Sequence, residues 1–130
     1  GSSEMRKVLW MKLAWNAPFN AINTLIGGPV KAIIAHPHTF ELARRVTEEV
    51  VTVANALGLP LVFEQVWEKN VAFSREYDVK TSMLQDLEAG KPLEHEALNG
   101  VIIKKAVERD LQAPYNFALY ALLSGLRIMS

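Results

Sequence analysis

Three polar side chains interrupt an apolar run near the start of the chain at a regular spacing. Lys12, Asn16 and Asn20 follow one another at intervals of four residues within WMKLAWNAPFN, residues 10–20. In an α-helix, residues four apart lie almost above one another, so the three would form one polar stripe. Asparagine is a poor helix former and an odd choice for a solvent-facing edge. The stripe therefore points to a ligand or to a partner helix for these groups.

A second polar group lies in TSMLQDLEAGKPLEHEALNG, residues 81–100. Its polar members are Ser82, Gln85, Asp86, Glu94, Glu96 and Asn99. Gly100 falls inside a predicted helix, where glycine costs up to about 1 kcal/mol relative to alanine. A close approach to another backbone or to a ligand would compensate for this cost. The first helix, with its polar stripe, is the neighbour that we expect.

Helical patterns must position both groups, because no strand pair and no alternation of strands and helices can be found. We expect an all-α, multi-helix domain with helices at residues 4–26, 30–36, 39–57, 62–77, 81–90, 93–111 and 114–129. Pro18 should kink the first, largely buried helix near the carbonyl of Ala14. Thr81 or Ser82 can cap the short helix that Gly90 ends. The helix at 62–77 should bury the stripe of Phe63, Val66, Trp67, Val71 and Phe73.

Composition narrows the function classes. The chain has 130 residues, of which half are hydrophobic and 22% are charged, as in one ordinary globular domain. Basic and acidic residues number 14 each without a basic cluster, which argues against nucleic-acid binding. No apolar run approaches the roughly 20 residues that a bilayer requires. The chain has no cysteine, so it has no disulfide and no thiolate metal site, which fits a cytoplasmic location.

Several common sites are missing from the sequence. The seven glycines form neither a G-x-G-x-x-G dinucleotide loop nor a phosphate-binding P-loop. His36, His38 and His95 lack the spaced carboxylates of a metal site, so we expect no metal. We expect residues 1–3 to be an expression scar and residues 4–130 to be a single helical domain for substrate binding and catalysis.

Five motifs occur in a fixed order along the chain. They are K-L-x-x-N-x-x-x-N from Lys12, S-M-L-Q-D from Ser82, G-K-x-x-E from Gly90, L-N-G from Leu98 and A-P-Y-N from Ala113. Together they resemble the C-terminal domain of ketopantoate reductase (2-dehydropantoate 2-reductase), over nearly the whole chain. The resemblance implies an all-α domain similar to the C-terminal domain of 6-phosphogluconate dehydrogenase-like enzymes. It also implies that NADP is bound mainly by an N-terminal Rossmann domain, which is absent from this chain.

The resemblance implies roles for individual residues in reducing a small 2-oxo acid, 2-dehydropantoate, to (R)-pantoate for pantothenate biosynthesis. Lys12 matches the general acid, and Glu94 matches the residue that orders the substrate and the lysine. Asn16, Asn20 and Ser82 match positions that hydrogen-bond the substrate. An ammonium group at the 2-oxo oxygen would stabilise the developing alkoxide and supply its proton. The isolated domain is expected to be inactive.

Each role has an ordinary structural alternative. Lys12 could snorkel from the end of a buried helix, and the two asparagines could form helix–helix hydrogen bonds. Ser82 could be a helix cap. Glu94 could begin the helix that follows, where a carboxylate favours the helix dipole.

Departures from the family pattern leave the substrate open. Lys91 stands where the family usually has arginine, Leu93 where it has threonine, and Glu96 where it has aspartate; His95 adds a further change. A related hydroxyacid dehydrogenase with another 2-oxo acid is therefore an alternative. Another is a non-catalytic helical module that dimerises through apolar helix faces. A homodimer is also possible if the chain is part of the enzyme.

Overall fold

The computed structural model describes the backbone of residues 2–78 and 80–128, with side chains up to residue 126. Its elements are α1 Ser2–Trp15, η1 Asn16–Asn20, α2 Ala21–Ile26, α3 Val30–Ala35, α4 Pro37–Ala56, α5 Phe63–Arg75, α6 Ser82–Glu88, η2 Glu96–Gly100, α7 Val101–Glu108 and α8 Pro114–Ile128. The two η elements are π-helical turns. No strand occurs in the described ranges, so the predicted all-α class is confirmed.

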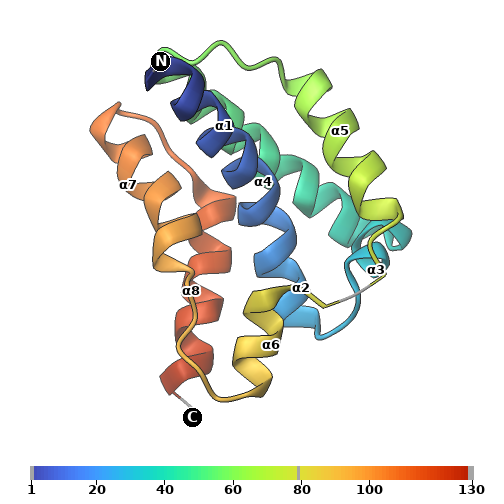
Figure 1. Ribbon diagram of the computed structural model, residues 1–130. Coiled ribbons are helices and arrows are strands. Elements are labelled where there is room, and N and C mark those ends of the chain that lie inside the picture. The colour runs from blue at the N-terminus through green and yellow to red at the C-terminus, as the bar shows by residue number, and fades with distance from the viewer. Residues whose placement is uncertain (1, 79, 129–130) are drawn as a thin grey trace.

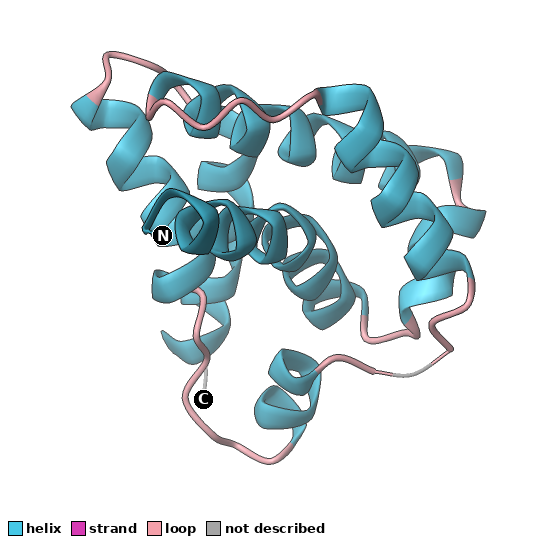
Figure 2. Ribbon diagram, turned by 45° about the horizontal axis from the view of Figure 1, so that its top comes forward, coloured by secondary structure: helices cyan, strands magenta, loops and turns pink. Residues whose placement is uncertain are grey.

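The helix α4 occupies the centre of the bundle and contacts η1, α1, α3, α5, α7 and α8. Its inward positions carry small and β-branched side chains, which let neighbouring helices approach closely. They are Ala43, Val46, Thr47, Val50, Val51, Val53 and Ala54. Helix α5 lies on one side of the α1–α4 pair, and α7 and α8 lie on the other (Figure 1). Helix α6 lies at one end of the bundle, and the loop that follows it leads toward η2 (Figure 1, Figure 2).

The disruption predicted at Pro18 takes the form of the π-helical turn η1. Proline has no N–H and its ring clashes with the carbonyl four residues earlier, which is that of Ala14. The side chain of Asn70, on α5, donates to this carbonyl at 3.0 Å. Asn99, on η2, likewise donates to the carbonyl of Ala17 at 3.0 Å. Two elements distant in sequence are thereby attached to the chain near Pro18, α5 at the end of α1 and η2 at the turn.

Two predictions about burial are wrong in part. The first predicted helix is buried over residues 17–24, but Met5, Val8 and Leu9 of α1 are 68%, 56% and 58% exposed. Phe73 of α5 is also 52% exposed. The buried stripe of α5 continues instead through polar residues, since Asn70 and Ser74 both find hydrogen-bond partners on α1. Hydrophobicity therefore placed Val66, Trp67 and Val71 correctly on the inner face and misassigned Phe73.

The helix predicted over 93–111 is shorter and begins with η2. The Gly100 amide donates to the carbonyl of His95 at 2.9 Å, five residues earlier, as in a π-helix. A Cβ atom on Gly100 would lie 3.3 Å from Tyr120 Cε2, so the close neighbour of this glycine is α8. The expected approach of Gly100 to the first helix is wrong; Asn99, the preceding residue, makes that contact.

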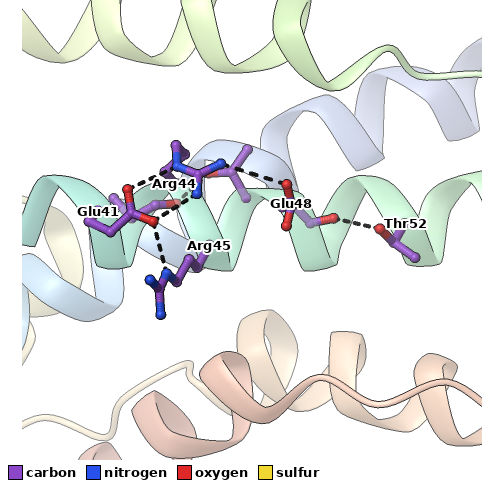
Figure 3. A network of polar contacts seen from close by, with 7 residues as sticks. Glu41, Arg44, Arg45, Glu48 and Thr52 are labelled. Atoms are coloured by element: carbon purple, nitrogen blue, oxygen red, sulfur yellow. Dashed lines mark hydrogen bonds and ion pairs between the residues drawn. The ribbon is translucent and has the colours of Figure 1, made fainter.

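A network of charged side chains lines one face of α4 (Figure 3). Glu41 accepts hydrogen bonds from Arg44 at 2.7 and 3.0 Å and from Arg45 at 2.8 Å. These bonds, first those from Arg44, lower the pKa of the Glu41 carboxyl from 4.5 to about 2. Arg45 also donates to the Tyr115 hydroxyl at 2.7 Å and so connects α4 to α8.

The lowered pKa of Glu41 predicts a pH-dependent contribution to stability. The folded state favours the ionised carboxyl, so the contribution is complete above pH 4.5 and is lost as the pH falls to about 2. We expect the difference in unfolding free energy between wild type and Glu41→Gln, measured by urea denaturation, to shrink over that interval. A difference equal at pH 7 and pH 2 would contradict this assignment.

The bond from Asn70 to the Ala14 carbonyl predicts a sensitive position on α5. Asn70→Ala leaves a buried carbonyl without a donor, and we expect the unfolding free energy to fall by about 1 to 3 kcal/mol. Gln65→Ala, on an exposed position of the same helix, is the matched control and should change it by less than about 0.5 kcal/mol. Equal effects of the two substitutions in urea denaturation would exclude a special role for Asn70.

Candidate functional site

A polar cavity of about 330 Å³ lies between η1, α6 and the segment that precedes η2. Its lining residues are Asn16, Asn20, Ser82, Met83, Asp86, Glu94 and Leu98. The structure therefore brings together four of the five predicted site residues, although they come from three separate segments. Their roles in chemistry stay predictions.

The two asparagines of the cavity are bonded to each other. Asn20 Nδ2 donates to Asn16 Oδ1, as their spacing of four residues allows. Asn20 is 7% exposed, and its Oδ1 has no hydrogen-bond partner among the described residues. A buried acceptor without a donor is costly, so this position favours a ligand or solvent group that can donate a hydrogen bond.

Ser82 stands free because the preceding residue caps the helix. Thr81 Oγ1 accepts from the Leu84 amide at 3.3 Å and donates to Asn23 Oδ1 at 2.9 Å. The structure thus decides between the two predicted caps in favour of Thr81. Ser82 is exposed and has no side-chain hydrogen bond within the described ranges.

Glu94 lies on the segment between α6 and η2 and is exposed. The acidic residue in the first turn of η2 is Glu96, so Glu94 does not begin that helix, as one alternative suggested. Its carboxyl group has no ion pair or hydrogen bond among the described side chains, and it reaches the cavity wall. It is therefore free to bind a ligand there.

Lys12 lies beside this cavity. It lines a groove of about 340 Å³ between α1 and α5, together with Met11, Trp15, Asn16, Lys69, Asn70, Phe73 and Tyr77. Lys12 is exposed and has no ion-pair or hydrogen-bond partner in the described part of the chain. Asn16 lines both spaces, so it marks the boundary between Lys12 and the polar cavity.

Aromatic side chains form one wall of the groove. Trp15 Nε1 donates to the buried Ser74 Oγ at 2.9 Å, which fixes the indole ring. The ring centroids of Phe73 and Tyr77 lie 5.3 and 5.7 Å from that of Trp15. Sequence reasoning missed Phe73 and Tyr77 as lining residues, because no motif contains them and the period of α5 assigned Phe73 to the core.

Charge is divided between the two spaces. The polar cavity carries the carboxyl groups of Asp86 and Glu94, whereas the groove carries the amino groups of Lys12 and Lys69. Asp86 was not among the predicted site residues, but a signal was present. Asp86 follows Ser82 by four residues on α6, and this spacing places both on one helix face.

The described residues offer neither a metal cluster nor a membrane-spanning helix. They contain no group of three or more histidine and carboxylate side chains that could hold a metal ion. None of the helices described is long and apolar enough to cross a membrane. His36 instead caps the start of α4, where its Nδ1 accepts from the His38 amide at 3.2 Å.

Comparison with known proteins identifies the class of domain to which this chain belongs. The fold is that of an all-helical domain that occurs in oxidoreductases of known structure. The family model described as "Ketopantoate reductase PanE/ApbA C terminal" matches residues 4–127. The chain therefore belongs to the ketopantoate reductase family and corresponds to its C-terminal domain, as the five motifs predict.

Curated relatives agree with this family. The 2-dehydropantoate 2-reductases of Pyrobaculum aerophilum and Archaeoglobus fulgidus are 34% and 32% identical over 89% and 91% of this chain. The matches cover 42% and 40% of those proteins, so the chain spans about two-fifths of the relatives' length.

Solved structures show the same arrangement of helices. The 2-dehydropantoate 2-reductase of Methylococcus capsulatus matches 96% of this chain and 40% of its own, with 34% identity and a TM-score of 0.87. A dimeric ketopantoate reductase from Staphylococcus aureus matches 95% of this chain and 43% of its own, with 30% identity and a TM-score of 0.86. D-mandelate dehydrogenase, at 17% identity and a TM-score of 0.90, shares the fold alone.

Unfolding measurements can test whether Thr81, and not Ser82, is the residue that stabilises the start of α6. Thr81→Ala removes a cap and a bond to Asn23, and we expect a loss of about 1 to 2 kcal/mol. Ser82→Ala should change the unfolding free energy by less than about 0.5 kcal/mol, since its hydroxyl supports no other described residue. A large loss in Ser82→Ala would show that the serine is structural.

Proposed function

We propose that this chain is the substrate-binding and catalytic domain of an NADP-dependent 2-oxo acid reductase that converts 2-dehydropantoate to (R)-pantoate. The observation that carries the proposal is the gathering of Asn16, Asn20, Ser82 and Glu94 around one cavity, with Lys12 beside it. Family membership supports the same reaction. A helical bundle without a ligand would not need polar side chains from three separate segments at one place.

The proposed chemistry is reduction of a carbonyl at the boundary between the cavity and the groove. NADPH, when bound, supplies a hydride to the 2-oxo carbon. The Lys12 ammonium then stabilises the developing alkoxide oxygen and donates its proton to it. Because Lys12 has no competing partner among the described residues, its amino group is available for this role.

The remaining residues would bind the substrate. Glu94 would orient the substrate and the lysine from the cavity that it lines. Asn16, Asn20 and Ser82 would hydrogen-bond its hydroxyl and oxo groups. The unpaired Oδ1 of Asn20 fits a substrate hydroxyl that donates a hydrogen bond.

The cofactor would be held mainly outside this chain. The sequence has no glycine-rich turn between a strand and a helix. Rossmann domains use such a turn to bind the pyrophosphate of a dinucleotide. The relatives are more than twice as long as the matched region, which leaves room for a Rossmann domain. We therefore propose that the chain is inactive alone and acts beside an N-terminal domain, in a cytoplasmic enzyme.

A second candidate keeps the chemistry and changes the substrate. The groove beside Lys12 is walled by Trp15, Phe73 and Tyr77. Such a surface favours a 2-oxo acid with a bulky apolar substituent, since apolar groups gain from burial against aromatic rings. A related hydroxyacid dehydrogenase would use this surface.

The assembly is proposed to be a homodimer, as is the ketopantoate reductase of Staphylococcus aureus. Exposed Val107 and Phe117, at 69% and 58%, flank an apolar groove between α7 and α8 that a second subunit could cover. A helical module that only dimerises would use the same face and would not need Lys12.

The decisive experiment is an assay of NADPH oxidation by this chain joined to its cofactor-binding domain. We expect turnover of 2-dehydropantoate, and Lys12→Ala should lower kcat/KM by about a hundredfold or more, as for loss of a general acid. Lys7→Ala removes the same charge from an exposed position of the same helix and should leave the rate nearly unchanged.

Other 2-oxo acids offered in the same assay separate the candidates. Preferred turnover of an aromatic or branched 2-oxo acid would favour the second candidate and keep the mechanism. Equal rates in Lys12→Ala and Lys7→Ala would contradict the assignment of Lys12. No turnover of any acid by a folded, cofactor-bound protein would favour the non-catalytic module.

A further inference from the structure

The segment that carries Glu94 has few anchors of its own. Gly90, Lys91, Pro92 and Glu94 are exposed, and only Leu93 is partly buried. A carboxyl group that orients a substrate must itself be held in place. Glu94 therefore needs a contact from a neighbouring residue to hold it at the cavity.

His95 is the buried residue next to Glu94 and is 8% exposed. Its Nε2 shares a hydrogen bond of 2.9 Å with Ser124 Oγ on α8. Its ring centroid lies 5.2 Å from that of Tyr120, on the same helix. Its carbonyl accepts from the amides of Leu98 and Gly100, at 3.3 and 2.9 Å. Both the side chain and the backbone of His95 are therefore anchored.

Tyr120 holds the other side of this residue. Its hydroxyl donates to the carboxylate of Glu96, and this bond is the main reason that the pKa of Tyr120 is raised. Gly100 allows the ring to approach, because a Cβ atom there would lie 3.3 Å from Tyr120 Cε2. Helix α8 thus contacts both residues 95 and 96, directly after Glu94.

Packing alone does not account for a histidine at position 95. His95 Nδ1 is buried and has no hydrogen-bond partner among the described residues. Phenylalanine would fill the space against Tyr120 without the cost of this unpaired nitrogen. What the imidazole provides is the bond from Nε2 to Ser124.

We infer that His95 is a positioning residue, whose bond to Ser124 directs the adjacent Glu94 into the substrate cavity. The inference rests on the proposed function for its catalytic consequence. Without the bond, residues 90–95 would lose their polar attachment to α8. Glu94 would then sample positions outside the cavity wall, and the substrate would be less well oriented.

Two amide substitutions separate the bond from its surroundings. In His95→Gln the side-chain amide reaches about as far as Nε2, and the Ser124 hydroxyl can pair with either its oxygen or its nitrogen. His95→Asn has the same polarity but reaches only the Nδ1 position. In the two-domain enzyme we expect kcat/KM to fall about tenfold in His95→Asn and to be retained in His95→Gln. Ser124→Ala, which removes the partner, should match His95→Asn; equal loss in both amide variants would overturn the inference.

Coupling to Glu94 provides the second test. If His95 acts through Glu94, His95→Asn should have little further effect on kcat/KM in the Glu94→Gln background. Additive losses in the double variant would mean that His95 acts on stability or elsewhere in the site, which overturns the inference.

A third measurement does not depend on catalysis. In the 130-residue chain, hydrogen exchange of the Gly100 amide reports the bond to the His95 carbonyl. The Gly100 amide should exchange faster in His95→Asn and at nearly the wild-type rate in His95→Gln. An unchanged exchange rate in both variants would overturn the inference that His95 anchors this segment. If the wild-type enzyme reduces no 2-oxo acid, the proposed function fails and this measurement alone decides whether His95 anchors the segment.

Discussion

Pro18 is the constraint on which the arrangement of this site depends. It denies the Ala14 carbonyl its helical donor and widens the first helix into the π-helical turn η1. Asn70 then attaches α5 to the end of α1, just before the turn, and Asn99 attaches η2 to the turn itself. The groove with Lys12 forms on the α5 side and the polar cavity forms on the side of α6 and η2. One missing N–H group therefore underlies both halves of the site.

A buried polar network carries this constraint into the core. Asn99 also donates to Asn116 Oδ1 at 3.0 Å, and Asn116 Nδ2 donates to Glu49 of α4 at 2.9 Å. The Glu49 carboxyl also accepts the amides of Tyr115 and Asn116 at 3.0 and 2.9 Å, at the start of α8. A carboxylate is favoured there because it pairs with the unsatisfied amides of a helix N-terminus. The network joins η1, η2, α4 and α8, so the cavity wall is fixed from the centre of the bundle.

The sequence predicts features that depend on local chemistry. Helical periodicity, the break at Pro18 and the resemblance of five motifs led to the all-α class and the family. Features that depend on tertiary partners could not be predicted from the sequence. Phe73 was assigned to the core because the burial of Asn70 and Ser74 requires knowledge of the carbonyl and the indole that they meet on α1. The neighbour of Gly100 could not be predicted for the same reason, since nothing near this glycine in the sequence indicates Tyr120.

The position of Lys12 also shows why the chain needs a cover to perform the proposed reaction. An exposed ammonium is surrounded by water, where a charge interaction at 4 Å is worth only about 1 kcal/mol. Stabilising an alkoxide by several kcal/mol requires that water be excluded from the groove. The aromatic wall of Trp15, Phe73 and Tyr77 excludes water from one side only. A second domain over Lys12 and Asn16 would close the other side, and the same closure would bring a hydride donor to the carbonyl that Lys12 is proposed to protonate.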